Sequence, residues 1–303
     1  MRTNEVVWWG EPGIELSSDD MAVVVLPRRG AKIASLHHRP SRREWLEQPD
    51  GELGGPPEYG SSFTQAALFG WDEMVPTIIS CPYPEGAHRG TQLPDHGEVW
   101  SLPWETGAGA EALVSQVAGR ALPYRLTRTM RLDGSRMTLD YLLATSGSTP
   151  LWLLWAAHPQ FAVEDGTRVV LPPEVGELVD VTAGSKQAIL PWPSPELESP
   201  LLLRAGTGRK LYLSPDLRVG TAGLIDGDGA WMSLAWNPAQ VPYLGIWLDN
   251  GAYARHPIIA LEPTTGYYDD LAAAVSNQRL RAIDPRHPLA WSLEVRLGKG
   301  RLP

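Results

Sequence analysis

The chain has 303 residues and a formal net charge of −9, and this acidic balance argues against nucleic acid or an anionic membrane as a partner. Hydrophobic residues make up 43% and charged residues 20%, which excludes an intrinsically disordered chain. The sequence has no apolar run of about 18 residues, so no membrane-spanning helix is expected.

The N-terminal stretch and the cysteine content indicate a compartment. MRTNEVVWWGEPGIEL lacks a basic start followed by an apolar segment, so no signal peptide is expected. Cys81 is the single cysteine, which rules out a disulfide framework. We therefore expect a cytoplasmic protein.

Runs typical of β-strands dominate the chain. Short apolar or alternating segments predict strands at 21–27, 31–38, 121–132, 136–145, 150–159, 209–215, 231–237, 243–249 and 289–297. Asp133 and Gly134 between two of these runs predict a tight hairpin. One helix is expected at 267–280, with Asp269 and Asp270 near its start.

This order of elements predicts a single all-β domain over residues 1–303. Strands and helices do not alternate, which argues against a parallel doubly wound sheet. The two loosest stretches, 48–62 and 191–200, are too short for domain linkers and are interpreted as loops over one face. The expected fold is a large antiparallel sandwich with few short helices.

The stretch LPDHGEVWS at 93–101 brings Asp95, His96 and Glu98 close together in sequence. A zinc deaminase motif is excluded because it needs two further cysteines. A metal site that uses His96, Glu98 and a distant histidine stays open. A plain turn, in which Gly97 adopts unusual backbone torsions, stays open as well.

Three other stretches carry acid/base or hydroxyl-binding side chains. LWLLWAAHPQFAV places His158 at the end of an apolar strand, as a structural residue or as a tunable group at a cleft edge. IIALEPTTGYYDDL places Glu262 at the end of a buried run, where a carboxylate is costly unless it is paired, used in chemistry or bonded to backbone amides. FGWDEMVPTI places Asp72 beside Trp71, in a polar loop or next to an aromatic face that binds sugar.

Taken in order, FGWDEMVPTI, DHGEVWSLPWE, HPQF and ALEPTTGYYDDL resemble the galactose mutarotase-like, or aldose 1-epimerase, superfamily. GAKIASLHHRPSRREWL and LAWSLEVRL fit the two ends of that family, so the resemblance covers about residues 20–298. It implies a large antiparallel β-supersandwich. It also implies an isomerase that interconverts the α and β anomers of a free sugar, with no metal and no cofactor.

The resemblance also implies roles for individual residues. Glu262 is the general base of sugar ring opening, His158 is the general acid, and His96 binds near the ring oxygen. A protonated imidazole facing an ionised carboxylate suits this chemistry near neutral pH. The residues expected to bind the sugar are Asp72, Arg89, Glu98, Trp71, Trp100, Trp247 and Asp249.

The motifs depart from the family pattern at three places. Asp95 stands where many mutarotases have Asn, and HPQFA replaces a His-x-Tyr-Phe-Asn string. Glu98-Val99-Trp100 stands where relatives specific for sugar 6-phosphates continue with a Phe-Ala-Arg-like string. A carboxylate there argues against a phosphorylated substrate, so the expected partner is a free sugar.

Two other classes of function stay open. One is a carbohydrate-binding protein without catalysis on the same sandwich, which has no need for an acid opposite a base. The other is a glycoside hydrolase or lyase, in which two of Glu73, Glu98 and Glu262 flank the bond about 5–10 Å apart. This interpretation gains if Glu98 faces Glu262 and His158 points away. The expected oligomeric state is a monomer or a homodimer.

Overall fold

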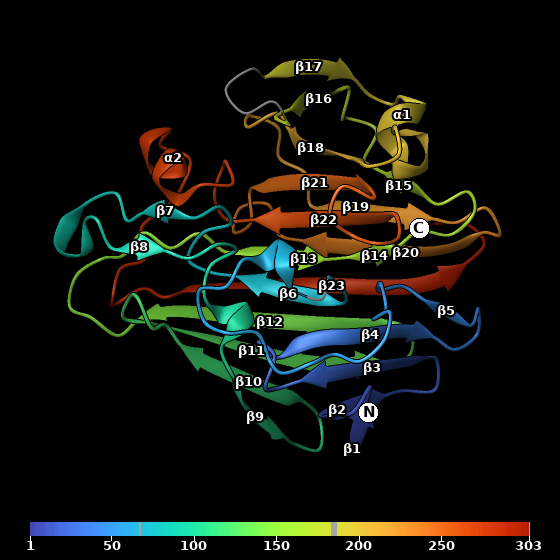
Figure 1. The fold of residues 1–303 in the computed structure, drawn as a ribbon, viewed down its shortest axis with the longest axis horizontal. Coiled ribbons are helices and arrows are strands. Elements are labelled where there is room, and N and C mark those ends of the chain that lie inside the picture. Colours follow the sequence, from blue (N-terminus) through green and yellow to red (C-terminus); the bar gives the residue numbers. More distant parts are fainter. Residues whose placement is uncertain (67, 183–186, 303) are drawn as a thin grey trace.

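The computed structural model describes residues 1–66, 68–182 and 187–302, and antiparallel β-strands dominate it (Figure 1). The larger sheet has 13 strands. Its main path runs β1 (Arg2–Trp8), β2 (Glu11–Ser17), β3 (Met21–Leu26), β4 (Lys32–His38), β6 (Trp71–Met74), β13 (Ala156–Pro159), β22 (Ile258–Thr264), β21 (Tyr243–Asn250), β18 (Thr207–Leu213), β16 (Glu177–Asp180) and β17 (Ala188–Pro191). Off this path, β5 (Arg43–Glu44) pairs with β4 and β14 (Phe161–Ala162) pairs with β22.

The second sheet has eight strands. Its order is β15 (Arg168–Val170), β19 (Thr221–Ile225), β20 (Ala230–Trp236), β23 (Leu289–Lys299), β12 (Arg136–Thr145), β11 (Tyr124–Asp133), β10 (Leu113–Ala118) and β9 (Glu105–Ala108). A separate hairpin joins β7 (Cys81–Pro82) to β8 (Gln92–Leu93). These two sheets confirm the predicted all-β antiparallel sandwich.

Helical structure among the described residues is short. The two α-helices are α1 (Pro195–Glu198) and α2 (Leu271–Ser276), and the 3-10 turns are η1 (Phe63–Gln65), η2 (Gly86–His88), η3 (Val99–Ser101) and η4 (Pro200–Leu202). None of the helices in the described ranges is long and apolar enough to cross a membrane.

Alternation along the strands explains how the second sheet packs. In β11 and β12 every other residue is buried, so one face of each strand enters the core while the opposite face carries exposed or half-buried residues. The predicted hairpin between them is confirmed, because Asp133 pairs with Arg136 and Gly134 has a positive φ of 55°. β22 is instead buried at all seven positions, since it lies in the interior of the larger sheet.

A buried ion pair connects the two sheets. Arg128 of β11 donates to Glu73 of β6 over 2.9 Å, and both side chains are almost fully buried. Glu73 also accepts a hydrogen bond from Tyr141 at 2.8 Å and one from the Trp155 indole at 2.8 Å. Arg128 donates in addition to the carbonyl of Ala31. Because the polar atoms are paired, the carboxylate is tolerated in the core.

Two predicted elements are shorter than expected. Of the strand predicted at 150–159, the structure forms only β13, because the preceding amides bond to loops and side chains, as Trp155 N–H does to Thr265 Oγ1 at 2.9 Å. The helix predicted at 267–280 is reduced to α2. The side chain of Asp270 caps its first turn by accepting from Ala273 N–H at 2.8 Å, so the helix begins at Leu271.

Candidate active site

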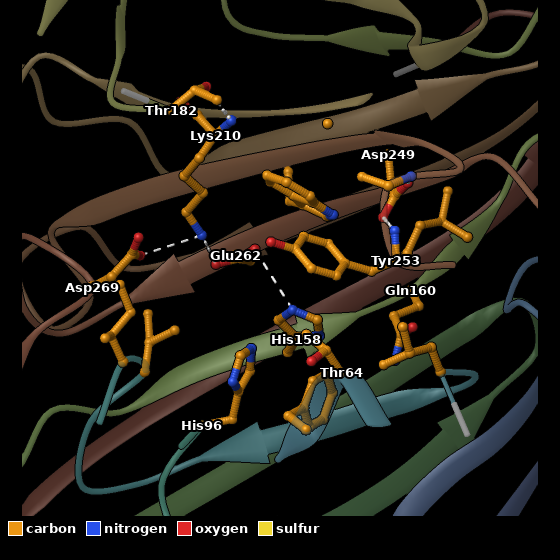
Figure 2. Close-up of a pocket in the computed structure, with 18 of the residues that line it drawn as sticks. Thr64, His96, His158, Gln160, Thr182, Lys210, Asp249, Tyr253, Glu262 and Asp269 are labelled. Atoms are coloured by element: carbon orange, nitrogen blue, oxygen red, sulfur yellow. Dashed lines mark hydrogen bonds and ion pairs between the residues drawn. The ribbon is translucent and has the colours of Figure 1, made fainter. Parts of the chain in front are cut away.

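A cavity of about 630 Å³ opens on the larger sheet, over β13, β22, β21 and β18 (Figure 2). Loops that precede or follow these strands complete its wall. The lining residues are Phe63, Thr64, Leu68, Ile78, Ile79, Asp95, His96, His158, Gln160, Val181, Thr182, Gly206, Thr207, Gly208, Lys210, Trp247, Asp249, Ala252, Tyr253, Ile258, Glu262, Tyr268 and Asp269. Its size is in the usual range for small-molecule sites, about 300–1,000 Å³.

His158 and Glu262 face each other in this cavity. His158 lies on β13 and Glu262 on the neighbouring strand β22. Nε2 of His158 is 3.9 Å from Oε1 of Glu262, and both side chains are buried. Within the described ranges, Oε1 of Glu262 and Nδ1 of His158 have no hydrogen-bond partner. Two titratable groups are thus close together with unsatisfied atoms beside open space.

The second carboxylate oxygen of Glu262 is held by a lysine. Lys210 on β18 donates to Oε2 of Glu262, and its Nζ is also 3.3 Å from Oδ1 of Asp269. Tyr212, two residues further along β18, donates a hydrogen bond from its hydroxyl group to Asp269. Figure 2 shows Lys210 reaching from β18 to the position between Glu262 and Asp269. Glu262 is therefore paired with a side chain, and no bond from a backbone amide of the following turn is present among the described residues.

His96 reaches the cavity from a tight turn. It has a positive φ of 57°, and Gly97 follows with a φ of 71°. Any side chain at Gly97 would collide with Val75, whose carbonyl oxygen would lie 2.2 Å from the added Cβ. The turn interpretation of this stretch is therefore confirmed, and the same turn presents His96 to the cavity.

Asp95 and Phe63 fix the His96 ring. Nδ1 of His96 is 2.8 Å from Oδ1 of Asp95, and the Phe63 ring stacks on the imidazole with centroids 4.1 Å apart. The other oxygen of Asp95 accepts from Phe63 N–H at 2.9 Å. Burial alone would raise the pKa of Asp95, but the His96 and Phe63 bonds outweigh it and hold that pKa below its usual value. An ionised Asp95 favours a proton on Nδ1 of His96 and leaves Nε2 for a ligand.

Electrostatics sets the charge of the facing pair. Burial, together with the nearby His96, Lys210 and Lys32, holds the pKa of His158 well below its usual 6.5. Burial also raises the pKa of Glu262, although Lys210 opposes that change. Desolvation therefore favours the neutral form of His158 in the free protein over the protonated form that would donate to a sugar.

Five of the predicted site residues line the cavity: His158, Glu262, His96, Trp247 and Asp249. The Trp247 indole fits against β18 because Gly208 has no side chain; an added Cβ there would lie 2.4 Å from the ring. The Asp249 carboxylate is engaged by backbone amides, with Ala252 N–H at 2.6 Å and Tyr253 N–H at 3.1 Å. Asp249 therefore fixes the loop that carries Tyr253.

Two predicted sugar ligands are buried acids with partners of their own outside the cavity lining. Asp72 is opposite His158 in the strand register, but it pairs with Lys32 at 2.5 Å. Glu98 accepts from the Tyr59 hydroxyl and from Ala121 N–H, each at 2.9 Å. The prediction that Asp72 and Glu98 bind the sugar directly is corrected, because both carboxylates point into the protein.

The remaining three predicted ligands also lie outside the lining. Trp71 is fully buried and packs edge-on against Phe161 in the core. Trp100 is buried under the 94–98 turn and donates its indole N–H to the carbonyl of Gly97 at 3.1 Å. Arg89 is exposed at the end of η2. Trp71 lies on a strand, where patterning does not reveal which face of the sheet a side chain occupies. Trp100 and Arg89 lie in or next to 3-10 turns, where no periodic pattern indicates the direction of a side chain.

Sequence reasoning missed Lys210, Asp269 and Phe63. The run RKLYLSP contained one signal, because Lys210 directly precedes the apolar residues Leu211 and Tyr212 of a predicted strand, and a lysine buried in such a strand needs a paired acid. Asp269 was assigned to a helix start, although the structure uses its carboxylate in the cavity. The described residues contain no group of three or more His, Cys, Asp or Glu side chains arranged to hold a metal.

Comparison with solved structures identifies the fold. A galactose mutarotase-like protein from Lactobacillus casei matches with a TM-score of 0.73 and 17% identity, over 94% of this chain and 100% of that one. The chain has the galactose mutarotase-like fold. A Clostridium acetobutylicum protein of the same description gives a TM-score of 0.72 at 12% identity, over 99% of each chain.

A third similar structure carries the name of an activity. It is an Escherichia coli protein provisionally named an aldose 1-epimerase, with a TM-score of 0.73 and 16% identity over 99% of this chain and 100% of that one. Neither a scan against protein-family models nor a sequence search of curated proteins gave a match. At these identities the likeness establishes the fold, and the activity has to be argued from the site.

Proposed function

We propose that this chain is an aldose 1-epimerase that interconverts the α and β anomers of a free sugar by acid/base ring opening. One observation carries the proposal: Nε2 of His158 is 3.9 Å from Oε1 of Glu262 at the wall of the cavity, with His96 beside them. Two proton-transfer groups so close together can act on the anomeric hydroxyl and on the ring oxygen of the same sugar.

The reaction needs one base and one acid. Oε1 of Glu262 takes the proton of the anomeric hydroxyl, and Nε2 of His158 gives a proton to the ring oxygen as the bond between that oxygen and C1 breaks. The open-chain aldehyde rotates about its C1–C2 bond. The hydroxyl oxygen that came from the ring then adds to the other face of C1 and returns its proton to His158, while Glu262 gives its proton to the aldehyde oxygen, which becomes the new anomeric hydroxyl, so both groups end as they began.

The low pKa of His158 has a consequence for this cycle. In the free protein a minor fraction of the imidazole is protonated near pH 7, and that fraction is the form able to donate to the ring oxygen. His96, held by Asp95 and Phe63, is positioned to bind a sugar oxygen through Nε2 next to this proton transfer. The rings of His96 and His158 meet edge to face with centroids 5.4 Å apart.

The cavity wall favours an uncharged carbohydrate. Trp247 and Tyr253 lie near each other, with ring centroids 5.8 Å apart, and offer aromatic faces for the apolar side of a sugar ring. The cation in the lining, Lys210, is already paired with Glu262 and Asp269. A phosphorylated sugar would therefore find acidic groups without a free positive charge among the described lining residues.

A glycoside hydrolase would need a second carboxylate opposite Glu262, and neither of the two glutamates predicted for that role is available. Glu73 is bonded to Arg128 between the sheets, and Glu98 is bonded to Tyr59 outside the cavity. His158 faces Glu262, which is the reverse of the arrangement that would favour a hydrolase. A binding protein without catalysis would not need this facing pair.

Polarimetry of freshly dissolved aldoses tests the proposal. We expect Glu262→Gln and His158→Ala each to lower kcat by at least about 100-fold, the usual scale for the loss of a general acid or base. His287→Ala and Glu164→Gln serve as controls because both side chains are exposed, and they should leave the rate unchanged. A near-normal rate in either site variant, with the fold intact by circular dichroism, would contradict the roles assigned.

A further inference from the structure

Lys210 occupies a position that the register of three strands creates. Tyr212 of β18 pairs with Gly245 of β21, and Gly245 pairs with Glu262 of β22. Gly245 has no side chain to fill this row, and an added Cβ would lie 3.2 Å from the Tyr212 ring and 3.5 Å from Oε2 of Glu262. The gap lets Lys210, two residues before Tyr212, reach Glu262 across β21.

A second anchor keeps the lysine in place. Its Nζ is 3.3 Å from Oδ1 of Asp269, and Asp269 also accepts a hydrogen bond from the Tyr212 hydroxyl group. The backbone carbonyl of Asp269 also accepts from Ile78 N–H at 3.0 Å and from Ile79 N–H at 2.9 Å, so this acid is fixed on both its side chain and its main chain. The Lys210 side chain is 13% exposed, and the ammonium group is therefore largely removed from solvent.

The two oxygens of Glu262 are consequently different. Lys210 holds Oε2, whereas Oε1 faces His158 and has no hydrogen-bond partner among the described residues. We propose that Lys210 is a positioning residue for the ring-opening reaction: it holds the Glu262 carboxylate ionised and oriented with Oε1 toward the substrate, and Asp269 and Tyr212 hold the ammonium group in place. This inference rests on the proposed function.

Opposing charges act on Glu262 from every side. The titratable groups around it are Lys210 and Tyr212 from β18, His158 from β13, His96 from the 94–98 turn, and Asp269 after β22. Burial raises the pKa of Glu262, Lys210 lowers it, and Asp269 raises it. Removing the positive charge of Lys210 and removing the negative charge of Asp269 must therefore move the pKa of Glu262 in opposite directions.

Carbon-13 NMR of glutamate carboxyl groups in the full, substrate-free chain measures this directly, with the Glu262 signal assigned from its loss in Glu262→Gln. We expect Lys210→Met to move the titration midpoint of Glu262 up by about 1–3 pH units, and Asp269→Asn to move it down. Lys210→Arg keeps the charge and should stay near the wild-type midpoint. Lys299→Met removes an exposed lysine paired with Asp228 and should change nothing. Midpoints that stay in place, or that move in the same direction in Lys210→Met and Asp269→Asn, would overturn the proposal.

The pH profile of kcat/KM gives the catalytic readout. In Lys210→Met the acidic limb should move to higher pH and in Asp269→Asn to lower pH, a pair of changes that a purely structural role would not produce. If Lys210→Met does not fold, Lys210→Gln and Asp269→Asn carry the same test. If the wild-type chain exchanges no anomers, the proposed function fails. The opposite NMR shifts would then still identify Lys210 as the group that sets the charge of Glu262.

Discussion

The ion pair between Glu73 and Arg128 offers a sharp test of how the two sheets are held together. Arg128→Met leaves Glu73 buried with two neutral donors, Tyr141 and Trp155, and without its counter-charge. Loss of one partner of a buried pair costs about 3–5 kcal/mol, which is a large part of the roughly 5–15 kcal/mol that stabilises a domain. Glu73→Gln should cost a similar amount, because it leaves the guanidinium group buried and unpaired.

A double variant isolates the pair. In Glu73→Gln with Arg128→Met the amide oxygen takes over one of the two bonds, because Tyr141 and Trp155 donate to different oxygens of Glu73, and neither charge of the pair remains. We expect it to cost less free energy of unfolding than the sum of the singles, with a coupling of about 3 kcal/mol. Urea unfolding followed by tryptophan fluorescence measures all three. Additive costs, or a Glu73→Gln variant of normal stability, would refute the reasoning and reopen a catalytic role for Glu73.

Three further predictions concern the cavity. The profile of kcat/KM against pH should be bell-shaped with its maximum below pH 7. Activity should fall on the alkaline side as His158 loses its proton and on the acidic side as Glu262 gains one, and a maximum above pH 8 would contradict this assignment of acid and base. Gly97→Ala should lower kcat and destabilise the chain by about 1–3 kcal/mol, because its φ is 71° and its Cβ would meet Val75; unchanged thermal unfolding would refute the strain. Trp247→Ala should raise KM about tenfold, whereas the exposed Arg89→Ala should leave it unchanged, and initial rates over a range of sugar concentrations distinguish the two.

Much of the fold followed from local patterns. The period-two alternation at 121–132 and 136–145, with Asp133-Gly134 between them, determines a hairpin by itself, and the structure forms it with that turn. Strand ends were harder to predict. The run at 150–159 is apolar throughout, yet most of its length bonds to loops, because burial and strand pairing are separate properties.

The site was predictable only in part. His158, Glu262 and His96 were found because each is a polar group at the edge of an apolar or turn-forming segment, and all three line the cavity. The contact of Lys210 with Glu262 depends on the register of β18, β21 and β22 and on the missing side chain at Gly245. Strand register is a long-range feature that a local sequence pattern does not contain. For Trp71, Trp100 and Glu98, burial in the protein interior outweighed their resemblance to ligand-binding residues.

The most direct test of the central claim is exchange NMR on a panel of free aldoses at anomeric equilibrium, with the chelator-treated wild-type chain. The account predicts exchange between the α and β signals of at least one aldose faster than in buffer, and its loss in Glu262→Gln. If no sugar exchanges faster than in buffer while sugar signals broaden on addition of the protein, the cavity binds carbohydrate without catalysis and the claim is contradicted.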